Sequence, residues 1–589
     1  MNTTRTRRSL TVRVYITTMK NIFFVLLFVA STFASAKQTT VFTASEINNG
    51  NWTAGDTILM KNGTWINQAI LLKGMGTEIH PVVLKAETPG SVILTGTSKI
   101  GFSGTYIIVS GLYFKDGTLS GSDVISFRTS SSELAENCTL TNSAIVNYNP
   151  TVNTVDSKWV SLYGKNNKVD HCSFENKNNS GTLLVVWLVN GVSVNHTVSQ
   201  NYFGYRNSNL DANGAELNGQ EIIRVGDSST SMTTASVTIQ GNFFEHCNGE
   251  IEVISNKSCG NYYSNNVFFE CHGMLTLRHG NSCTVDGNYF FGNGISETGG
   301  VRIIGENHKV YNNYFEKLRG TDYRSAICIV RGKLNSLPNE YFQVKNALIA
   351  FNTMVDCKEA LSINYNSSTS CTLPPTSTVI AHNNVYNTSS SNINVDVDLL
   401  DAAMDITWKN NLMNTGKFSN FTYTTTQVIT GNDPKLSLSG TTINMYEPIA
   451  GSALLNYPTT EYPEVTTDIR GRDRGTLAKI PGASQFSGTI TRVMPTKTGV
   501  GAAFLNLTGT GLKYQNQLTG FQAYKSGQCI KTRVSTSGNL NIYDLTGKCL
   551  HQQVLASGTS TALFTKKGIY VLSFDTNVGE HYTQKIILD

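Results

Sequence analysis

The sequence predicts an all-β protein, a right-handed parallel β-helix followed by a small C-terminal β-sandwich. Three observations carry this prediction. A short motif, Asn-x-aromatic or Asn-x-apolar, recurs roughly every 24 residues in the centre of the chain; short runs of alternating apolar residues lie between its copies; and no amphipathic helix of useful length is visible. Glycine is abundant, with 51 residues, and proline is scarce, with 12, as in chains of many short strands joined by turns.

Residues 1–36 have the features of an export signal. Lys20 is followed by an apolar run over residues 22–30 and then by Ala-Ser-Ala at residues 34–36, a small-x-small cleavage pattern. The apolar run is too short to span a membrane comfortably, which favours a cleaved signal over a retained anchor. We therefore expect a mature chain that begins near Lys37 and has no membrane span.

Cleavage changes the charge balance. The formal net charge of the whole chain is +5, and residues 1–36 hold five basic residues and no acidic residue, so the mature chain has a net charge of zero. Global charge therefore gives no support for a polyanionic partner, and we expect no nucleic acid to bind. Any argument for an acidic ligand must rest on local clusters of charge.

The recurring motif predicts that the β-helix spans residues 37–487. A repeat of this length holds three short strands and their turns, which is one coil whose alternate side chains pack against the coils above and below. A leucine-rich repeat would show an L-x-x-L-x-L pattern, and a β-propeller would need repeats near 40 residues. The motif asparagines should stack as an internal ladder in which each amide bonds to the next. They are Asn201, Asn242, Asn266, Asn288, Asn313, Asn352, Asn384 and Asn411.

The chain has eleven cysteines and no C-x-x-C pair. Four of them recur at 12-residue steps, which favours small buried core residues over zinc ligands. These four are Cys247, Cys259, Cys271 and Cys283. Cys357 and Cys371 are candidates for a disulfide, because an exported protein meets oxidising conditions.

The repeat signals fade after residue 445. We expect residues 468–483 to form the last coil and its cap, residues 488–512 to be a linker, and residues 513–589 to hold short strands at sandwich spacing. This last part resembles the C-terminal sorting domain of Bacteroidetes proteins secreted by the type IX system. The resemblance implies the secretion machinery as a partner, and a secreted, cell-surface or periplasmic location in a Gram-negative bacterium. An ordinary accessory β-sandwich is the alternative.

The strongest chemical signal is the pair Glu250 and Glu252, because a Glu-x-Glu pair in a strand places both carboxylates on one face. Lys257 follows the same strand. Steps of one coil, 24–26 residues, lead from Glu250 back to Arg224, and from Glu252 forward to Arg278 and then to Arg302. A single groove should therefore collect these charges. The full set expected in the groove is Arg224, Glu250, Glu252, Lys257, Arg278, His279 and Arg302. The alternative is that the charges are separately solvated or pair across coils, but several functional types fall in register together.

This set of side chains fits a metal and a proton-transfer site. Two carboxylates separated by one residue, together with an amide oxygen, suit a hard cation such as Ca²⁺, whereas zinc would favour histidine or cysteine. Arginines in the groove would pair with acidic sugars. A cation and arginines beside Lys257 would disfavour its ammonium form, so that the amine can serve as a base. These parts suit abstraction of a proton next to a uronate carboxylate.

Three segments of the chain resemble polysaccharide lyase family 6, the β-helical lyases that include alginate lyases and chondroitinase B. They are residues 218–226 (NGQEIIRVG), 249–258 (GEIEVISNKS) and 275–280 (LTLRHG), and the resemblance extends over about residues 40–485. The resemblance implies a role for each matching residue: calcium ligands Asn218, Glu250 and Glu252; general base Lys257; acid toward the leaving 4-oxygen Arg278; and substrate-binding residues Arg224 and His279. Because arginine holds its proton very tightly, a water or a proton relay is the alternative acid.

The segment around Arg302 bears on the substrate. Residues 299–308 resemble the alginate-lyase branch, where Arg302 would meet a uronate carboxylate, and the chondroitinase B branch resembles this segment without the arginine. Alginate is uronate at every position, which suits a row of arginines. We therefore expect a secreted lyase that cleaves alginate by Ca²⁺-assisted β-elimination and leaves unsaturated uronate ends. The alternatives are a dermatan sulfate lyase, a non-catalytic β-helical glycan-binding surface protein and, with less support, a hydrolase with paired acids.

Overall fold

The computed structural model describes residues 36–119, 121–210, 216–389, 395–399, 405–439, 444–475, 478–505, 521–526, 529–534, 536–544, 546–563, 568–577 and 581–588. The predicted export signal, apart from its last residue, lies outside these ranges, as do residues 506–512 of the predicted linker. Within them, regular structure is almost entirely β-strand, and α1 (Ala44–Asn48) packs against the first coils. No helix in these ranges is long and apolar enough to cross a membrane.

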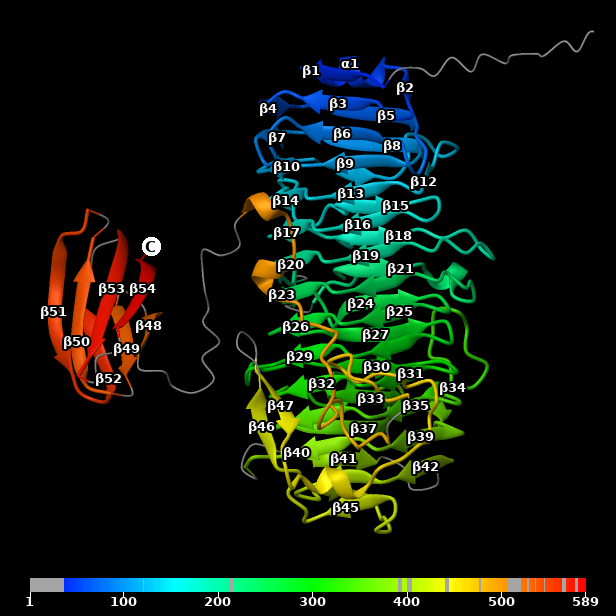
Figure 1. Cartoon of the computed structure of the whole chain (residues 1–589), viewed down its shortest axis with the longest axis vertical. Helices are drawn as coiled ribbons and strands as arrows, with labels where there is room; N and C mark the ends of the chain where they lie inside the picture. Colours follow the sequence, from blue (N-terminus) through cyan, green and yellow to red (C-terminus); the bar gives the residue numbers. More distant parts are fainter. Residues whose placement is uncertain are drawn as a thin grey trace, which may run out of the picture.

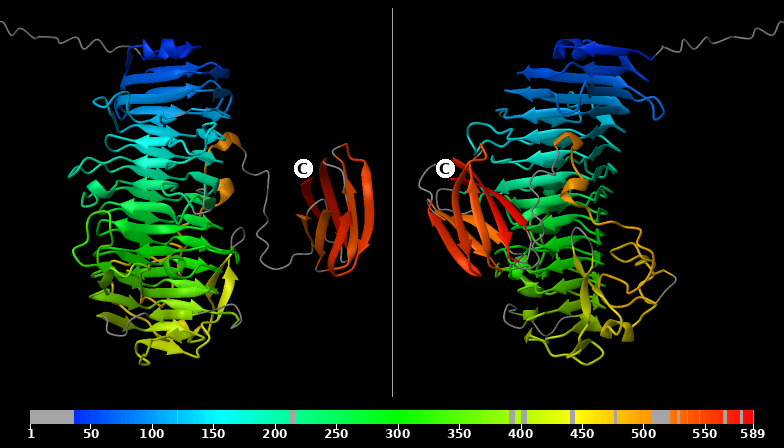
Figure 2. Two further views of the ribbon diagram at one scale, coloured as in Figure 1. Left: turned by 180° about the vertical axis from the view of Figure 1, so that it is seen from behind. Right: turned by 60° about the vertical axis from the view of Figure 1, so that its left-hand side comes forward.

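The predicted parallel β-helix is confirmed (Figure 1, Figure 2). Successive strands of one coil belong to three different sheets, and each strand pairs in parallel with its counterpart in the next coil, which makes the core continuous along the axis. We name the sheets A, B and C.

Sheet A contains β1 (Gln38–Val41), β3 (Thr57–Met60), β6 (Val82–Ala86), β9 (Ile107–Ser110), β13 (Thr139–Thr141), β16 (Lys168–Asp170), β19 (Thr197–Ser199), β22 (Thr238–Gln240), β25 (Tyr262–Ser264), β28 (Thr284–Asp286), β31 (Lys309–Tyr311), β35 (Leu348–Ala350), β39 (Thr378–Ala381) and β42 (Ile406–Lys409). Sheet B contains β2 (Trp52–Thr53), β5 (Ala69–Met75), β8 (Lys99–Thr105), β11 (Ile125–Ser126), β15 (Val160–Leu162), β18 (Leu184–Val186), β21 (Ile223–Val225), β24 (Glu252–Lys257), β27 (Met274–His279), β30 (Val301–Ile303), β33 (Ile327–Val330), β37 (Glu359–Tyr365), β41 (Val395–Leu399) and β44 (Phe418–Ser419), with β12 (Ala135–Glu136) beside β8. Sheet C contains β4 (Gly63–Ile66), β7 (Val92–Thr95), β10 (Leu112–Lys115), β14 (Ala144–Val146), β17 (Ser173–Glu175), β20 (Tyr202–Asn207), β23 (Phe243–Asn248), β26 (Val267–Phe269), β29 (Tyr289–Phe291), β32 (Tyr314–Glu316), β36 (Thr353–Val355), β40 (Asn384–Tyr386), β43 (Asn411–Met413) and β45 (Val428–Thr430).

The predicted asparagine ladder is present, with one change of residue. It runs from Asn201 to Asn411, and each Nδ2 donates to the Oδ1 of the next rung at 2.9–3.0 Å. The rung after Asn352 is Asn383, and not the neighbouring Asn384. All rungs are buried, so the ladder satisfies amide groups that would otherwise be unpaired in the core.

The aromatic residues of the motif form a second ladder. From Phe203 to Phe315, successive rings stack face to face with centroids 4.6–4.9 Å apart. The four cysteines at 12-residue steps are buried, as expected. The predicted disulfide between Cys357 and Cys371 is absent, and both thiols are free. Cys371 lies in β38 (Cys371–Leu373), a strand outside the three sheets, whereas Cys357 follows β36 into the core.

After β45 the chain turns back along the outside of the helix, and the prediction that residues 468–483 form the last coil is wrong. Residues 478–505, here called the strap, follow sheet C toward the N-terminal coils (orange in Figure 1). The amide of Ala483 donates to Thr353 Oγ at 2.8 Å, and the amide of Ala503 donates to Asn142 Oδ1 at 2.9 Å. Residues 488–505, the first part of the predicted linker, are therefore bound to the helix.

Outward-facing apolar side chains explain why the strap binds there. Sheet C presents a stripe of buried residues on its outer face, and strap residues such as Met494 and Val500 pack against it. The stripe comprises Tyr202, Phe243, Val267, Phe269, Tyr289, Phe291, Tyr314 and Val355. Ion pairs fix the strap at its edges: Lys497 Nζ lies 2.7 Å from Glu245, and Arg492 lies 3.4 Å from Asp286.

The predicted C-terminal β-sandwich is confirmed. One antiparallel sheet has the order β48-β49-β52, and the other has the order β51-β50-β53-β54, with a shared apolar core that includes Ile530, Leu540 and Phe574. The strands are β48 (Phe521–Ser526), β49 (Cys529–Val534), β50 (Gly538–Tyr543), β51 (Cys549–Leu555), β52 (Gly558–Leu563), β53 (Gly568–Thr576) and β54 (His581–Leu588).

Candidate active site

A pocket of about 290 Å³ opens on the outer face of sheet B, at β24 and β27. Its wall contains six of the eight residues predicted for the site, which are Asn218, Glu250, Glu252, Lys257, Arg278 and His279. Ser228, Ile251 and Asn339 complete the lining. The stacking of the coils therefore brings together side chains that are up to 61 residues apart in the sequence.

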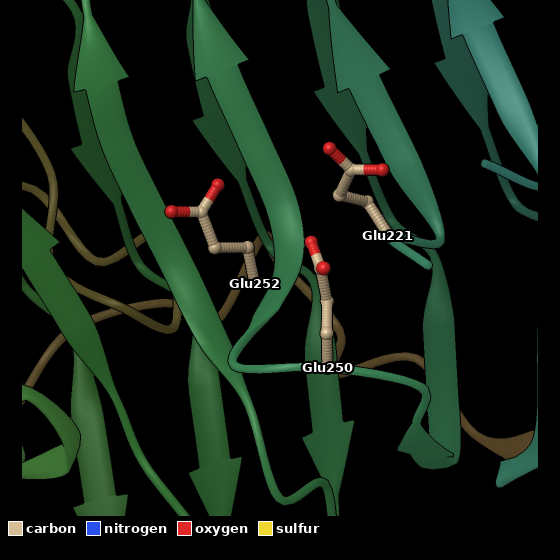
Figure 3. Close-up of side chains that lie close together, drawn as sticks. All are labelled: Glu221, Glu250 and Glu252. Carbon is tan, nitrogen blue, oxygen red and sulfur yellow. The ribbon is translucent and has the colours of Figure 1, made fainter. Parts of the chain in front are cut away.

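A third glutamate joins the predicted pair. One carboxylate oxygen each from Glu221, Glu250 and Glu252 lie within 4.8 Å of one another, and Figure 3 shows the three side chains converging. Glu221 was not predicted from the sequence. The position of Glu221 in the repeat was a signal for it. Ile223 of β21 pairs with Ile254 of β24, and Glu221 and Glu252 each lie two residues before this pair.

The three carboxylates repel one another in a buried place. Burial raises the pKa of Glu250 to about 8, and the charges of Glu221 and Glu252 add to the shift. The amide of Gly219 donates to Glu250 Oε2 at 3.0 Å, and Thr182 Oγ donates to Glu221 Oε2 at 2.6 Å. Cationic side chains border the cluster: Lys257 Nζ lies 3.7 Å from Glu221, and Arg278 Nε lies 3.7 Å from Glu252. The donor set, three carboxylates beside the Asn218 amide, fits a hard cation with oxygen ligands.

Lys257 and His279 stand beside the carboxylates as the candidate base and a neutral hydrogen-bonding group. Lys257 ends β24, and its Nζ lies 3.7 Å from Glu221 Oε1. His279 is paired with Lys257 in the register of β24 and β27. Burial, together with the charges of Arg278 and Lys257, lowers the pKa of His279 to about 3, so the imidazole is neutral at neutral pH.

Arg278 is held by a segment from a later coil, residues 332–343, here called the arm. Arg278 Nη1 donates to the carbonyl of Glu340 at 2.6 Å, and its guanidinium carbon lies 4.5 Å from the ring centroid of Tyr341. The arm is braced by pairing of β34 (Gly332–Lys333) with β38 and by an ion pair between Lys333 and Glu340. The arm was not predicted, because a contact through a backbone carbonyl leaves no residue-type signal.

The other two predicted arginines lie next to the pocket and not in its wall. Arg302 is buried on β30 and donates to Glu252, two strands away. Arg224 lies on β21, and its guanidinium carbon is 5.4 Å from the ring centroid of Trp187. Arg224 therefore faces the preceding coil and not the carboxylates.

The registers expected for this row of charges are wrong. The predicted steps placed Arg224 beside Glu250 and Arg302 beside Arg278, whereas Arg224 pairs with Ser255 and Arg302 pairs with Thr276. The coils differ in length, and β24 shifts register twice against β27, once after Glu252 and once before Lys257. A prediction based on a repeat of constant length does not include these shifts in register.

Residues 42–457 match the model of the chondroitinase B family. This is more than half of the chain. The chain belongs to this family of polysaccharide lyases, family 6. No curated protein sequence matches the chain.

Solved structures of family 6 lyases resemble this family member closely. The alginate lyase AlyGC has a TM-score of 0.63 and 34% sequence identity, covering 70% of this chain and 55% of AlyGC. A mannuronic acid specific lyase from the human gut microbiota has a TM-score of 0.57 and 28% identity, covering 66% of this chain and 88% of that chain. The family 6 lyase from Pseudopedobacter saltans has a TM-score of 0.55 and 28% identity, covering 66% and 96%. The chain thus spans about half the length of AlyGC.

Proposed function

We propose that the protein is a Ca²⁺-dependent lyase that cleaves alginate by β-elimination. The observation that carries this proposal is the convergence of three buried carboxylates beside the amine of Lys257 and the guanidinium of Arg278 in one pocket. Family membership supports lyase chemistry. The choice of alginate is supported by AlyGC, which is named an alginate lyase, and by the specificity for mannuronic acid stated for the gut enzyme.

Each residue of the pocket would have its own role in the reaction. A bound Ca²⁺ would neutralise the uronate carboxylate and so acidify the neighbouring C5 proton. Lys257 takes that proton on its Nζ, the electron pair forms the C4=C5 double bond, and the bond from C4 to its oxygen breaks. Arg278 stabilises the charge on the leaving 4-oxygen, which is protonated by Arg278 or by a water. His279, as a neutral imidazole, orients the sugar.

The test is a direct assay on two polymers. Purified protein with CaCl₂ should raise the ultraviolet absorbance of an alginate solution as unsaturated ends form, EDTA should stop the rise, and added Ca²⁺ should restore it. A parallel assay on dermatan sulfate distinguishes an alginate lyase from a dermatan sulfate lyase. Binding of alginate without any absorbance rise would instead support a glycan-binding surface protein and overturn the proposal.

A base variant tests the roles inside the pocket. Lys257→Ala should lower kcat by a factor of about 100 or more, the usual loss for a general base, with the fold intact because the side chain is partly exposed. Lys168→Ala on sheet A removes the same charge far from the pocket and serves as the control. Near-full activity of Lys257→Ala would exclude the lysine as base.

We further propose that the protein is secreted and that its C-terminal β-sandwich directs export by a type IX system. The resemblance of residues 513–589 to sorting domains supports this. In a bacterium with that system, the full chain should reach the medium or cell surface, and a chain ending at residue 505 should stay in the periplasm. Equal export of both chains would mean that the sandwich has an accessory role only.

A further inference from the structure

Four side chains form a stack on the outer face of sheet B, on coils that precede the pocket. The rings of Tyr163 and Trp187 lie parallel, with centroids 5.9 Å apart and an interplanar angle of 8°. The guanidinium carbon of Arg128 lies 3.7 Å from the Tyr163 centroid, and that of Arg224 lies 5.4 Å from the Trp187 centroid. We call Arg128, Tyr163, Trp187 and Arg224 the cation–ring stack. All four side chains are half-buried.

The stack is aligned with Lys257. Pairing across five successive strands, β11, β15, β18, β21 and β24, joins Ser126, Ser161, Val185, Arg224 and Ser255. Residues two places apart share a face of a strand, so the residues two places further on form one column. That column consists of Arg128, Tyr163, Trp187, Gly226 and Lys257. From Arg128 to Lys257 it covers four strand spacings, about 19 Å.

The carboxylate nearest in effect to the stack is Asp123, whose charge interacts with that of Arg128; burial raises the pKa of Asp123 and so favours its neutral form. Within the described part of the chain neither Arg128 nor Arg224 forms an ion pair, and Arg224 Nε is buried without a hydrogen-bond partner. Arg278 and Arg302, in contrast, both lie beside Glu252. The stack therefore carries positive charge that is available to a ligand.

The rings hold these guanidinium groups in place. Trp187 Nε1 donates to Ser161 Oγ at 3.2 Å, which fixes the indole, and the faces of both rings are covered by each other and by the two arginines. Cation–ring contact restrains an arginine side chain by the face of its guanidinium group, and a group held in this way can still bind a carboxylate through its terminal N–H groups. Restraint before binding lowers the entropy cost of capturing an anionic chain.

We propose that Arg128, Tyr163 and Trp187 extend the substrate-binding role that the family resemblance implies for Arg224, so that the cation–ring stack is an accessory binding site for a stretch of uronate residues on the N-terminal side of Lys257. The two arginines lie three strands apart, about 14 Å, so they would engage carboxylates on separate sugars of one chain. A long polymer would reach from the pocket to Arg128, and a short oligosaccharide in the pocket would not. This inference rests on the proposed function, because it assigns part of the same substrate.

The experiment compares kcat/KM for alginate polymer and for an alginate trisaccharide, in CaCl₂. We expect Arg128→Ala to lower the ratio of polymer to trisaccharide kcat/KM about tenfold, the effect of one lost charge-assisted contact. Trp187→Ala should lower it too, because it removes the ring that holds Arg224 and the stacking partner of Tyr163, and Trp187→Phe should keep most of it. Lys115→Ala is the matched control, since Lys115 lies over the Tyr113 ring at 5.9 Å but on sheet C.

Each outcome either supports or overturns the accessory binding site. An unchanged ratio in Arg128→Ala, with an unchanged Tm, would overturn the accessory site and give the stack a structural role only. If Trp187→Ala does not fold, Arg128→Ala and Trp187→Phe still carry the test. Failure of the proposed function is distinct, because the wild-type protein would then release no unsaturated product from either substrate.

Discussion

Arg302 on β30 donates a hydrogen bond to Glu252 on β24, across the intervening strand β27. Glu252 is also one of the three carboxylates that converge in the pocket, and its Oε1 lies 3.7 Å from Arg278 Nε. One carboxylate is therefore shared between the candidate cation site and two arginines. Cation binding and arginine position must be coupled, because both compete for the same oxygens.

The first prediction follows from this competition. Arg302→Met removes a buried positive charge next to the carboxylates, so we expect Ca²⁺ to bind about fivefold more tightly while kcat/KM on alginate falls. Titration calorimetry with CaCl₂ measures the affinity. Arg302→Lys keeps the charge and is the control. Weaker Ca²⁺ binding in Arg302→Met would mean that Arg302 chiefly orients Glu252.

The second prediction concerns Glu221, the carboxylate that was not predicted from the sequence. Glu221→Gln keeps the shape of the side chain and removes one ligand charge, so Ca²⁺ affinity should fall about tenfold or more. Glu136→Gln on β12, an exposed site, gives the same change in net charge. Equal Ca²⁺ affinities in the two variants would show that Glu221 is not a ligand of the cation.

The third prediction is a pH dependence. The pKa of Glu250 is about 8 in the folded protein and has an ordinary value near 4.5, so the folded state keeps a proton that the unfolded chain releases between these values. Stability contributed by this proton is full below about pH 4.5 and is lost as the pH rises toward 8. In EDTA, the Tm of the wild-type protein should therefore fall more steeply from pH 5 to pH 8 than that of Glu250→Gln.

Two comparisons sharpen the pH experiment. Glu359 has a pKa raised to about 7 by burial, but it is present in both proteins and cancels in the difference. Saturating Ca²⁺ should reduce the difference between wild type and Glu250→Gln in slope, because a bound cation favours the ionised carboxylate. Parallel slopes in EDTA would show that Glu250 does not carry the raised pKa.

The fourth prediction tests the asparagine ladder. Asn288→Ala removes an amide whose Nδ2 donates to Asn313 Oδ1 and to the carbonyl of Tyr263, and whose Oδ1 accepts from Asn266. Several buried groups lose their partners, so the free energy of unfolding should fall by about 3 kcal/mol or more. Urea unfolding measures the loss. Asn178→Ala, at an exposed position, should change it by less than about 0.5 kcal/mol.

The sequence predicted the repeating parts of this molecule well, because a repeat constrains the same contact many times. The ladder from Asn201 to Asn411 and the buried cysteines both follow from spacing alone. The one shifted rung, Asn383 in place of Asn384, lies where two asparagines are adjacent and spacing cannot choose between them.

The non-repeating parts were predicted poorly, for a physical reason. The register of Arg302 depends on bulges in β24, and the position of Arg278 depends on backbone carbonyls in the arm. Neither depends on residue type. The strap was taken for a final coil and a linker because its apolar residues bind the outside of the helix in no regular period.

The strap also sets an order of events during folding. Its contacts span 130 residues between Thr353 and Ala483, and 361 residues between Asn142 and Ala503. It can bind only to coils that are already stacked, so its docking is a late step in folding. Until the strap docks, the aromatic stripe of sheet C is open to water on a helix whose coils are already stacked. That interval is when an unfinished molecule is most exposed to aggregation and most in need of a chaperone.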